Sequence, residues 1–199
     1  MENFKTYCDI FSPFPYLIVE NTFSHDEMNL IWEELEFINQ PHKVNSILNE
    51  SNPNFNCKKI NLKEVFKALD CSSISNLYKH FLSQDLYDQV SKLNFGYNLI
   101  ALANYHDIIV NYYCDENFEK IHRDNCLFTC LTSLYKEPKK FSGGNIKFDM
   151  FNTEVELKNN STLIFPSFVH TSINEVKMVN DIQYGNGQYY IKTLISQRL

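Results

Sequence analysis

From residue 98 to the end, short runs rich in β-branched and aromatic residues alternate with turn signals, and this pattern limits the folds open to the chain. The turn signals are KEPKK, SGG, KNN and GNG, and helical periodicity is weak between them. Short strands at this spacing are typical of an antiparallel sandwich or roll. We expect strands at 99–103, 107–113, 127–135, 145–148, 154–157, 161–165 and 189–195.

The first half of the chain has mainly helical patterns. A short apolar run at 16–19 predicts a strand, and Ser24 with Glu27 then forms a capping-box pair ahead of a helix. Apolar side chains recur along that helix at a spacing that gives it one buried face: Met28, Ile31, Trp32, Leu35 and Ile38.

Two further helices are expected at 61–69 and 73–93, the second of them broken near Ser83. The polar stretch 39–56 contains two prolines and predicts a loop. We therefore expect a single domain over 1–199, with a helical support region at 1–97, including the loop at 39–56, and a jelly-roll core at 98–199. The fold class is α+β, mainly β: a double-stranded β-helix (a cupin-like jelly roll) with the N-terminal helices packed on its outside.

Charge and hydropathy narrow the possible partners. The chain of 199 residues has a formal net charge of −6 and no long basic run, so we expect no nucleic-acid partner. It contains no apolar run of about 18 residues and no signal-peptide pattern, so we expect no membrane partner and a cytoplasmic location. The six cysteines are scattered without a CxxC pair, which favours free thiols.

The sequence EKIHRDN, at 119–125, contains the first candidate for chemistry. On an extended strand, side chains two residues apart point to the same side. His122 and Asp124 then converge, as two ligands of one metal ion must, while Arg123 points away. A lone HxD is also typical of a charged surface turn.

His170 is the candidate for a third ligand. It follows an expected strand in the apolar sequence STLIFPSFVH, where a histidine is more often a structural residue. Two histidines and one carboxylate, however, form the facial triad that binds non-haem Fe(II). Between them, Gly143 and Gly144 permit a close backbone approach before a strand.

Three ordered motifs, NYYCDENFEKIHRD, FSGGNIKF and LIFPSFVHTSINEV, resemble the core of prolyl-4-hydroxylase-type Fe(II)- and 2-oxoglutarate-dependent dioxygenases. The resemblance covers residues 107–195, and YLIVENTFSHDEMNLIWEEL resembles the entry strand and first helix of that family. It implies that His122, Asp124 and His170 bind Fe(II) and that Tyr113 contacts 2-oxoglutarate. The implied reaction uses O2 to hydroxylate a peptidyl (prolyl-type) or small-molecule C–H bond, with release of succinate and CO2.

The last core strand departs from the family pattern. The resemblance implies an Arg or Lys that pairs with the distal carboxylate of 2-oxoglutarate, but Gln188 or Tyr189 stands at the expected place. Lys192 shares a strand face with Gln188 and could supply the charge, unless a bulge near Gly187 changes the facing or Lys192 is an ordinary exposed lysine. Lys177 and Arg198 are weaker candidates.

This departure keeps other functions open. One alternative is a non-catalytic binding or viral structural protein on the same roll, with an impaired co-substrate site. It is compatible with a virus-encoded chain, because residues 40–97 look similar to uncharacterised phage-type members. Another is a metal-binding roll that does not use 2-oxoglutarate. In the enzyme hypothesis, the loop at 39–56 acts as a lid over the acceptor.

Overall fold

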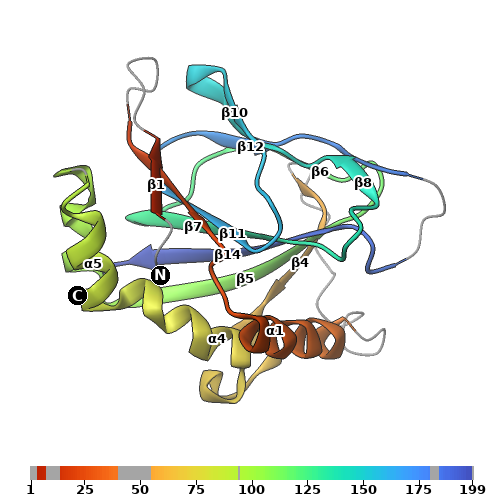
Figure 1. The fold of residues 1–199 in the computed structure, drawn as a ribbon, viewed down its shortest axis with the longest axis horizontal. Helices are drawn as coiled ribbons and strands as arrows, with labels where there is room; N and C mark the ends of the chain where they lie inside the picture. Colours follow the sequence, from red (N-terminus) through yellow and green to blue (C-terminus); the bar gives the residue numbers. More distant parts are fainter. Residues whose placement is uncertain (1–3, 8–13, 40–54, 94, 180–183, 199) are drawn as a thin grey trace.

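The computed structural model describes residues 4–7, 14–39, 55–93, 95–179 and 184–198, and these residues form a mainly β structure with helices on one side (Figure 1). The mainly β, α+β class predicted from the sequence is thus confirmed. All but the first and the last two residues of the predicted loop at 39–56 lie outside the described residues. Its last two residues form a short strand.

Most of the strands belong to two antiparallel sheets, which we call the large and the small sheet. The large sheet has the order β1 (Phe4–Tyr7), β2 (Tyr16–Glu20), β11 (Ser161–Pro166), β7 (Phe128–Leu134), β14 (Gln188–Ser196), β5 (Tyr105–Tyr113) and β4 (Lys58–Asn61). The small sheet has the order β10 (Thr153–Val155), β9 (Ile146–Phe148), β12 (Thr171–Ile173), β6 (Phe118–His122) and β3 (Phe55–Asn56). A separate pair is formed by β13 (Val176–Met178) and β8 (Phe141–Gly143).

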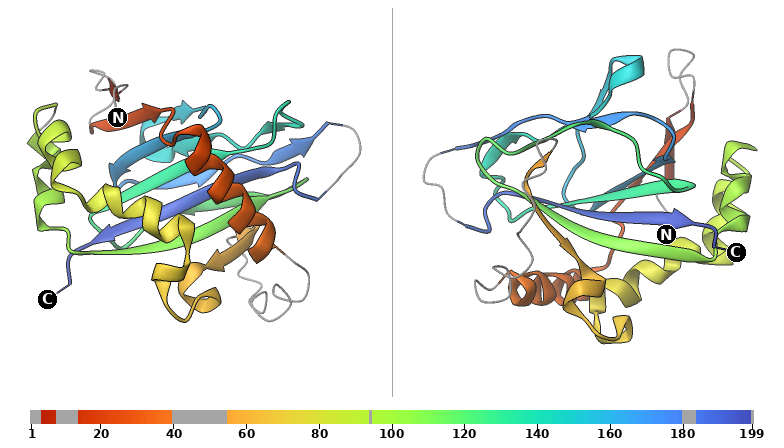
Figure 2. Two further views of the ribbon diagram at one scale, coloured as in Figure 1. Left: turned by 60° about the horizontal axis from the view of Figure 1, so that its bottom comes forward. Right: turned by 180° about the vertical axis from the view of Figure 1, so that it is seen from behind.

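The helices cover the face of the large sheet that points away from the small sheet (Figures 1 and 2). They are α1 (His25–Ile38), α3 (Leu62–Val65), α4 (Ser73–Tyr78) and α5 (Gln84–Val90), with the 3-10 turns η1 (Leu69–Cys71), η2 (Lys79–Leu82) and η3 (Phe95–Leu102). A further 3-10 turn, η4 (Asp149–Phe151), connects β9 to β10 in the small sheet. Among the residues that the structure describes, none of these helices is long and apolar enough to cross a membrane.

The large sheet separates two hydrophobic clusters. Tyr189 and Ile191 of β14 pack with the helices, whereas Tyr190, between them in sequence, packs in the second cluster with residues of the small sheet. This is the two-residue alternation of a strand buried on both faces. The space between the sheets therefore receives the side chains of Gln188, Tyr190 and Lys192.

The first helix forms as its sequence predicts. The Ser24 N–H donates to Glu27 Oε2 at 2.7 Å, and the Glu27 N–H donates back to Ser24 Oγ at 3.4 Å, which completes the capping box. Ile31, Leu35 and Ile38 are buried, as their spacing requires. The predicted break near Ser83 is also confirmed, because the Ser83 side chain accepts from Leu86 N and begins α5.

Several predicted elements are wrong in type or extent. The expected strand at 99–103 lies mostly in η3, because Tyr97 and Ile100 turn inward three residues apart while Leu99 and Leu102 are about half exposed. The helix expected at 61–69 ends after one turn at Phe66. Strands β1, β3, β4, β6, β8, β12 and β13 were not predicted, and β1 to β4 bring the first 97 residues into both sheets. Cys57, Cys71, Cys114, Cys126 and Cys130 are free thiols, as expected.

Tyr97→Phe is expected to lower the free energy of unfolding by about 1–3 kcal/mol. The fully buried Tyr97 hydroxyl lies 3.1 Å from the carbonyl oxygens of both Pro15 and Ile164, and it links η3 to the large sheet. Urea unfolding at pH 7 measures the change. The exposed Leu99→Ala in the same turn serves as a control and should change stability less; the reverse order would contradict this account.

Candidate functional site

Three predicted site residues meet between the two sheets. His122 is the last residue of β6 in the small sheet, Asp124 follows it by two residues, and Lys192 lies in the middle of β14 in the large sheet. The Lys192 ammonium nitrogen Nζ lies 3.1 Å from His122 Nε2 and 3.2 Å from Asp124 Oδ1. The two latter atoms are 3.8 Å apart. His122 Nε2 and Asp124 Oδ1 therefore point to one position, and the buried Lys192 ammonium group occupies it.

The His122 ring is fixed by its backbone. Nδ1 lies 3.0 Å from the carbonyl oxygen of Lys120, which can only accept, so Nδ1 carries the hydrogen. In the neutral ring the lone pair is then on Nε2, the atom that faces the Lys192 ammonium. This tautomer suits hydrogen bonding to an ammonium group and equally suits metal binding.

Asp124 is oriented by a neighbouring hydroxyl. The Thr129 side chain donates to Asp124 Oδ2 at 2.8 Å, which leaves Oδ1 directed at Lys192. Thr129 Oγ1 lies 2.9 Å from Ser167 Oγ, and Ser167 in turn contacts Cys126. Burial raises the pKa of the Cys126 thiol, so this cysteine remains a neutral part of the hydroxyl network.

Glu119 is a site residue that sequence reasoning missed. The residue is 1% exposed, and its Oε1 lies 2.8 Å from Lys59 Nζ and 3.8 Å from Lys192 Nζ. The Tyr113 hydroxyl donates to Oε2 at 3.0 Å. Burial by itself raises the pKa of this carboxyl, but electrostatic interactions with Lys192, His122 and Lys59 outweigh it and bring the pKa down to about 2.

Charge is balanced within this cluster. Burial lowers the pKa of Lys192, but Glu119 and Asp124 outweigh that effect and raise the pKa above its ordinary value. Two ammonium groups, of Lys59 and Lys192, thus face two carboxylates, of Glu119 and Asp124. Lys59 comes from the basic sequence CKKINLKEV, in which Lys58–Asn61 form β4 beside β5.

Gln188 lies on the same strand face as Lys192, as the sequence predicts, and both are buried. The pairing of β14 with β5 is continuous from Gln188↔Tyr113 onward, so no bulge between Gln188 and Lys192 changes which side of the sheet their side chains point to. Gln188 Nε2 donates to Ser133 Oγ at 3.2 Å, and a Cβ built on Gly144 would lie 2.0 Å from Gln188 Oε1. Gly144 has φ +73°, so the predicted close approach at the two glycines is observed.

Tyr113 is fully buried between the sheets, and burial raises the pKa of its hydroxyl well above the ordinary value. Its hydroxyl is engaged by Glu119, which stands between Tyr113 and the converging pair. Lys177 and Arg198, the weaker candidates for a carboxylate partner, are mostly exposed and pair with Glu175 and Asp107 instead. Lys192 is thus the candidate cation that lies beside His122 and Asp124.

His170 is near this cluster along the sheet but is not gathered into it. The next residue, Thr171, pairs with His122 in the small sheet. His170 Nδ1 is buried and finds no hydrogen-bond partner among the described residues. Within the same part of the chain, no group of three His, Cys, Asp or Glu side chains is placed so that it could hold a metal ion.

The donor set fits a divalent metal in part. Imidazole nitrogen and carboxylate oxygen are donors that such metals accept, so His122 Nε2 and Asp124 Oδ1, which are 3.8 Å apart, would hold the ion together. The Lys192 ammonium group now occupies the position between those two atoms. His170 Nδ1, which has no hydrogen-bond partner among the described residues, could supply a further ligand. For a metal ion to bind, the His170 side chain would have to move toward the pair and the Lys192 side chain would have to move away from it.

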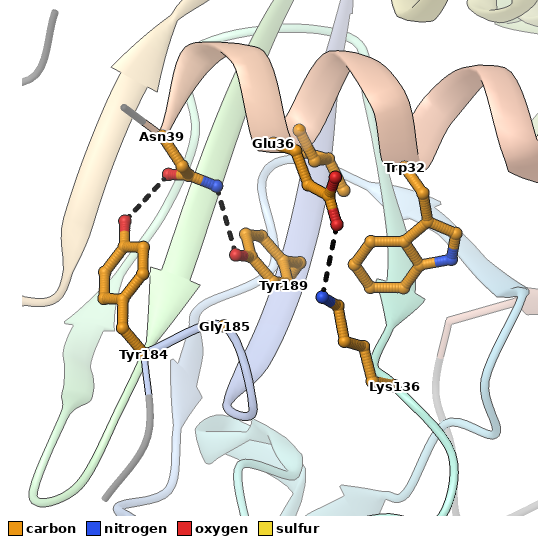
Figure 3. Close-up of a pocket in the computed structure, with 8 residues that line it drawn as sticks. Trp32, Glu36, Asn39, Lys136, Tyr184, Gly185 and Tyr189 are labelled. Atoms are coloured by element: carbon orange, nitrogen blue, oxygen red, sulfur yellow. Dashed lines mark hydrogen bonds and ion pairs between the residues drawn. The ribbon is translucent and has the colours of Figure 1, made fainter. Parts of the chain in front are cut away.

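A separate cavity of about 210 Å³ lies on the other face of the large sheet, under α1 (Figure 3). Trp32 and Tyr189 line it, and its polar groups bond to one another: Asn39 Nδ2 donates to the Tyr189 hydroxyl at 3.1 Å, and Lys136 Nζ lies 3.3 Å from Glu36 Oε1. Tyr189 and Lys192 project from opposite faces of β14. This cavity is therefore not an entrance to the converging pair.

No protein-family model and no curated protein sequence matches the chain. Solved structures do match its fold. A Pseudomonas putida prolyl-4-hydroxylase superposes with a TM-score of 0.62 at 13% identity, over 95% of this chain and 96% of that one. The viral collagen prolyl hydroxylase of Paramecium Bursaria Chlorella virus-1, in complex with 2-oxoglutarate, gives 0.56 at 12% identity, over 94% and 98%. NgTET1 in complex with 5mC DNA gives 0.51 at 11% identity, over 92% and 72%. The chain therefore shares the fold of these two prolyl hydroxylases and of NgTET1.

Proposed function

We propose that the chain is a non-haem Fe(II)- and 2-oxoglutarate-dependent oxygenase with a jelly-roll core. It hydroxylates a peptidyl (prolyl-type) or small-molecule C–H bond with O2 and releases succinate and CO2. The observation that carries the proposal is the convergence of His122 Nε2 and Asp124 Oδ1, 3.8 Å apart, on a buried cation position between the sheets. The shared fold supports the same class.

In this proposal His122 and Asp124 bind the metal, and His170 turns toward them as the third ligand. Its Nδ1 is buried and has no hydrogen-bond partner among the described residues. Iron bound there would supply the activation of oxygen and the oxidation of the C–H bond. The Lys120 carbonyl keeps the His122 lone pair on Nε2, and Thr129 keeps Asp124 Oδ1 turned to the centre. Such outer partners determine how well ligands are presented.

The proposed co-substrate residues are Tyr113, Gln188 and Lys192. Lys192 supplies the positive charge that a dicarboxylate needs, and the Gln188 amide can donate a hydrogen bond on the same strand face. Tyr113 reaches the co-substrate only if its hydroxyl leaves Glu119. The apolar cluster of the two sheets, which includes Tyr113 and Tyr190, excludes water from this space.

The proposal is tested with purified protein under argon. Addition of 2-oxoglutarate to the Fe(II)-loaded protein is expected to produce a weak visible charge-transfer band, and admission of air should produce succinate even without an acceptor. Protein without added Fe(II), in the presence of a chelator, is the control and should show neither. Absence of both signals from a folded, Fe(II)-treated sample would refute the proposal.

A second function is favoured by one observation, the presence of Lys192 at the cation position. If this ammonium never leaves, the chain is a non-catalytic binding or viral structural protein on the oxygenase fold. It would then bind neither Fe(II) nor 2-oxoglutarate. The same titration under argon separates the two functions.

A further inference from the structure

The Lys192 ammonium and a metal ion need the same two atoms. Nζ lies within 3.2 Å of both His122 Nε2 and Asp124 Oδ1, and the Lys192 side chain is 5% exposed. We propose that Lys192 is the resident cation of the His122–Asp124 pair, so that a divalent metal binds only by displacing it. The inference rests on the proposed function only in taking this pair as metal ligands.

Competition follows from the geometry of the lone pairs. The Nε2 lone pair of the neutral ring and one lone pair of Oδ1 already accept from the ammonium group. A metal ion bonded to the same lone pairs would lie within van der Waals contact of Nζ. Two positive charges at that distance in a buried site repel strongly, so the ion and the ammonium group exclude each other.

Displacement is opposed by the surroundings of Lys192. Its remaining carboxylate neighbour, Glu119, is 3.8 Å away and already bonds Lys59 at 2.8 Å. A displaced but still buried ammonium group would therefore lose its closest acceptors, which is costly. Removing the charge of Lys192 should accordingly open the pair to metal.

The test measures binding, without turnover. Wild-type protein, Lys192→Met and Lys177→Met are titrated with Mn(II) by calorimetry at pH 7, with and without 2-oxoglutarate. Lys192→Met is expected to bind Mn(II) at least roughly tenfold more tightly than the wild type without 2-oxoglutarate, and the metal should raise its melting temperature more. Lys177→Met, a lysine whose side chain is 72% exposed, should match the wild type.

Lys192→Met leaves the carboxylates of Glu119 and Asp124 with one ammonium group, that of Lys59, and this charge imbalance could destabilise the folded protein. The double variant Lys192→Met/Glu119→Gln restores the charge balance and should show the same gain in metal affinity. Circular dichroism confirms that each variant is folded before titration.

Each outcome decides between the hypotheses. Equal, measurable affinity in wild type and both Lys192 variants overturns the competition while leaving the proposed function intact. Tight binding by the Lys192 variants, with none by the wild type even with 2-oxoglutarate, supports the competition and refutes the proposed function. No binding by any folded variant refutes both.

Discussion

Glu119→Ala is expected to lower the free energy of unfolding at neutral pH by about 3–5 kcal/mol. The residue is 1% exposed, and its carboxylate is the acceptor shared by Lys59, Lys192 and the Tyr113 hydroxyl. Its removal leaves a buried ammonium group and a buried hydroxyl with fewer partners, and that penalty exceeds what any single exposed ion pair contributes. Urea unfolding followed by tryptophan fluorescence measures the change.

Two controls separate charge from packing in this experiment. Glu119→Gln keeps the shape and an acceptor for Tyr113 but removes the charge, so it should fall between wild type and Glu119→Ala. Glu175→Ala breaks an exposed pair with Lys177 at 3.6 Å and should change stability by no more than about 1 kcal/mol. A loss at Glu119 as small as that at Glu175 would show that the cluster does not stabilise the fold.

The contribution of Glu119 should also depend on pH. Its pKa is about 2 in the folded chain against an ordinary 4.5, so the folded state favours the ionised carboxylate. A lowered folded pKa gives stability that is fully present above the unfolded value and is lost as pH falls through the folded value. The stability difference between wild type and Glu119→Gln is expected to be constant from about pH 5 to 7 and to shrink between about pH 4.5 and 2. A difference that grows on acidification would contradict the assignment.

Long buried strands and capped helices were predictable because their signals are local. β5, β7, β11 and β14 are continuous apolar or β-branched runs, and all four lie in the large sheet. The capping box at Ser24 and the break at Ser83 each depend on side chains within three residues. Such features need no knowledge of the tertiary structure.

Short strands and η3 were missed because tertiary contacts determine them. β12 and β13 have three residues each, too few to show alternation, and are defined by their partners β6, β9 and β8. In η3 an apolar run resembles a strand, but the buried contacts of Tyr97 with Pro15 and Ile164 favour a 3-10 turn. Sequence pattern alone does not contain these contacts.

The site was predictable to the extent that its members lie close together in sequence. His122 and Asp124 share a motif, and the alternation of β14 places Lys192 on the face of Gln188. Glu119, although only three residues before His122, gave no signal, because its role depends on Lys59 from β4 and Lys192 from β14.

Asp124→Ala is expected to weaken divalent-metal binding by more than the roughly 10–100-fold that loss of an outer-shell partner costs, because it removes a ligand itself. It also leaves Lys59 and Lys192 with Glu119 as their one remaining carboxylate in the cluster, so the local charge becomes positive and repels a cation. Thr129→Val is the matched comparison: it removes the 2.8 Å hydrogen bond to Asp124 Oδ2 and leaves the carboxylate in place. Its expected loss is within roughly 10–100-fold.

These titrations are informative in two backgrounds. If Lys192 competes with metal for His122 and Asp124, the wild-type protein binds metal weakly, and Asp124→Ala can lower that affinity only a little further. The substitution should therefore be repeated in the Lys192→Met background. There the loss is expected in full, with Mn(II) calorimetry as the measurement and Asp88→Ala, on the exposed side of α5, as the neutral control. Stoichiometric Mn(II) binding by the Lys192→Met/Asp124→Ala double variant would show that the metal uses other ligands, whatever the role of Lys192. A graded loss from wild-type Asp124 through Thr129→Val to Asp124→Ala would instead tie the metal to the oxygen atom that Lys192 contacts in this structure.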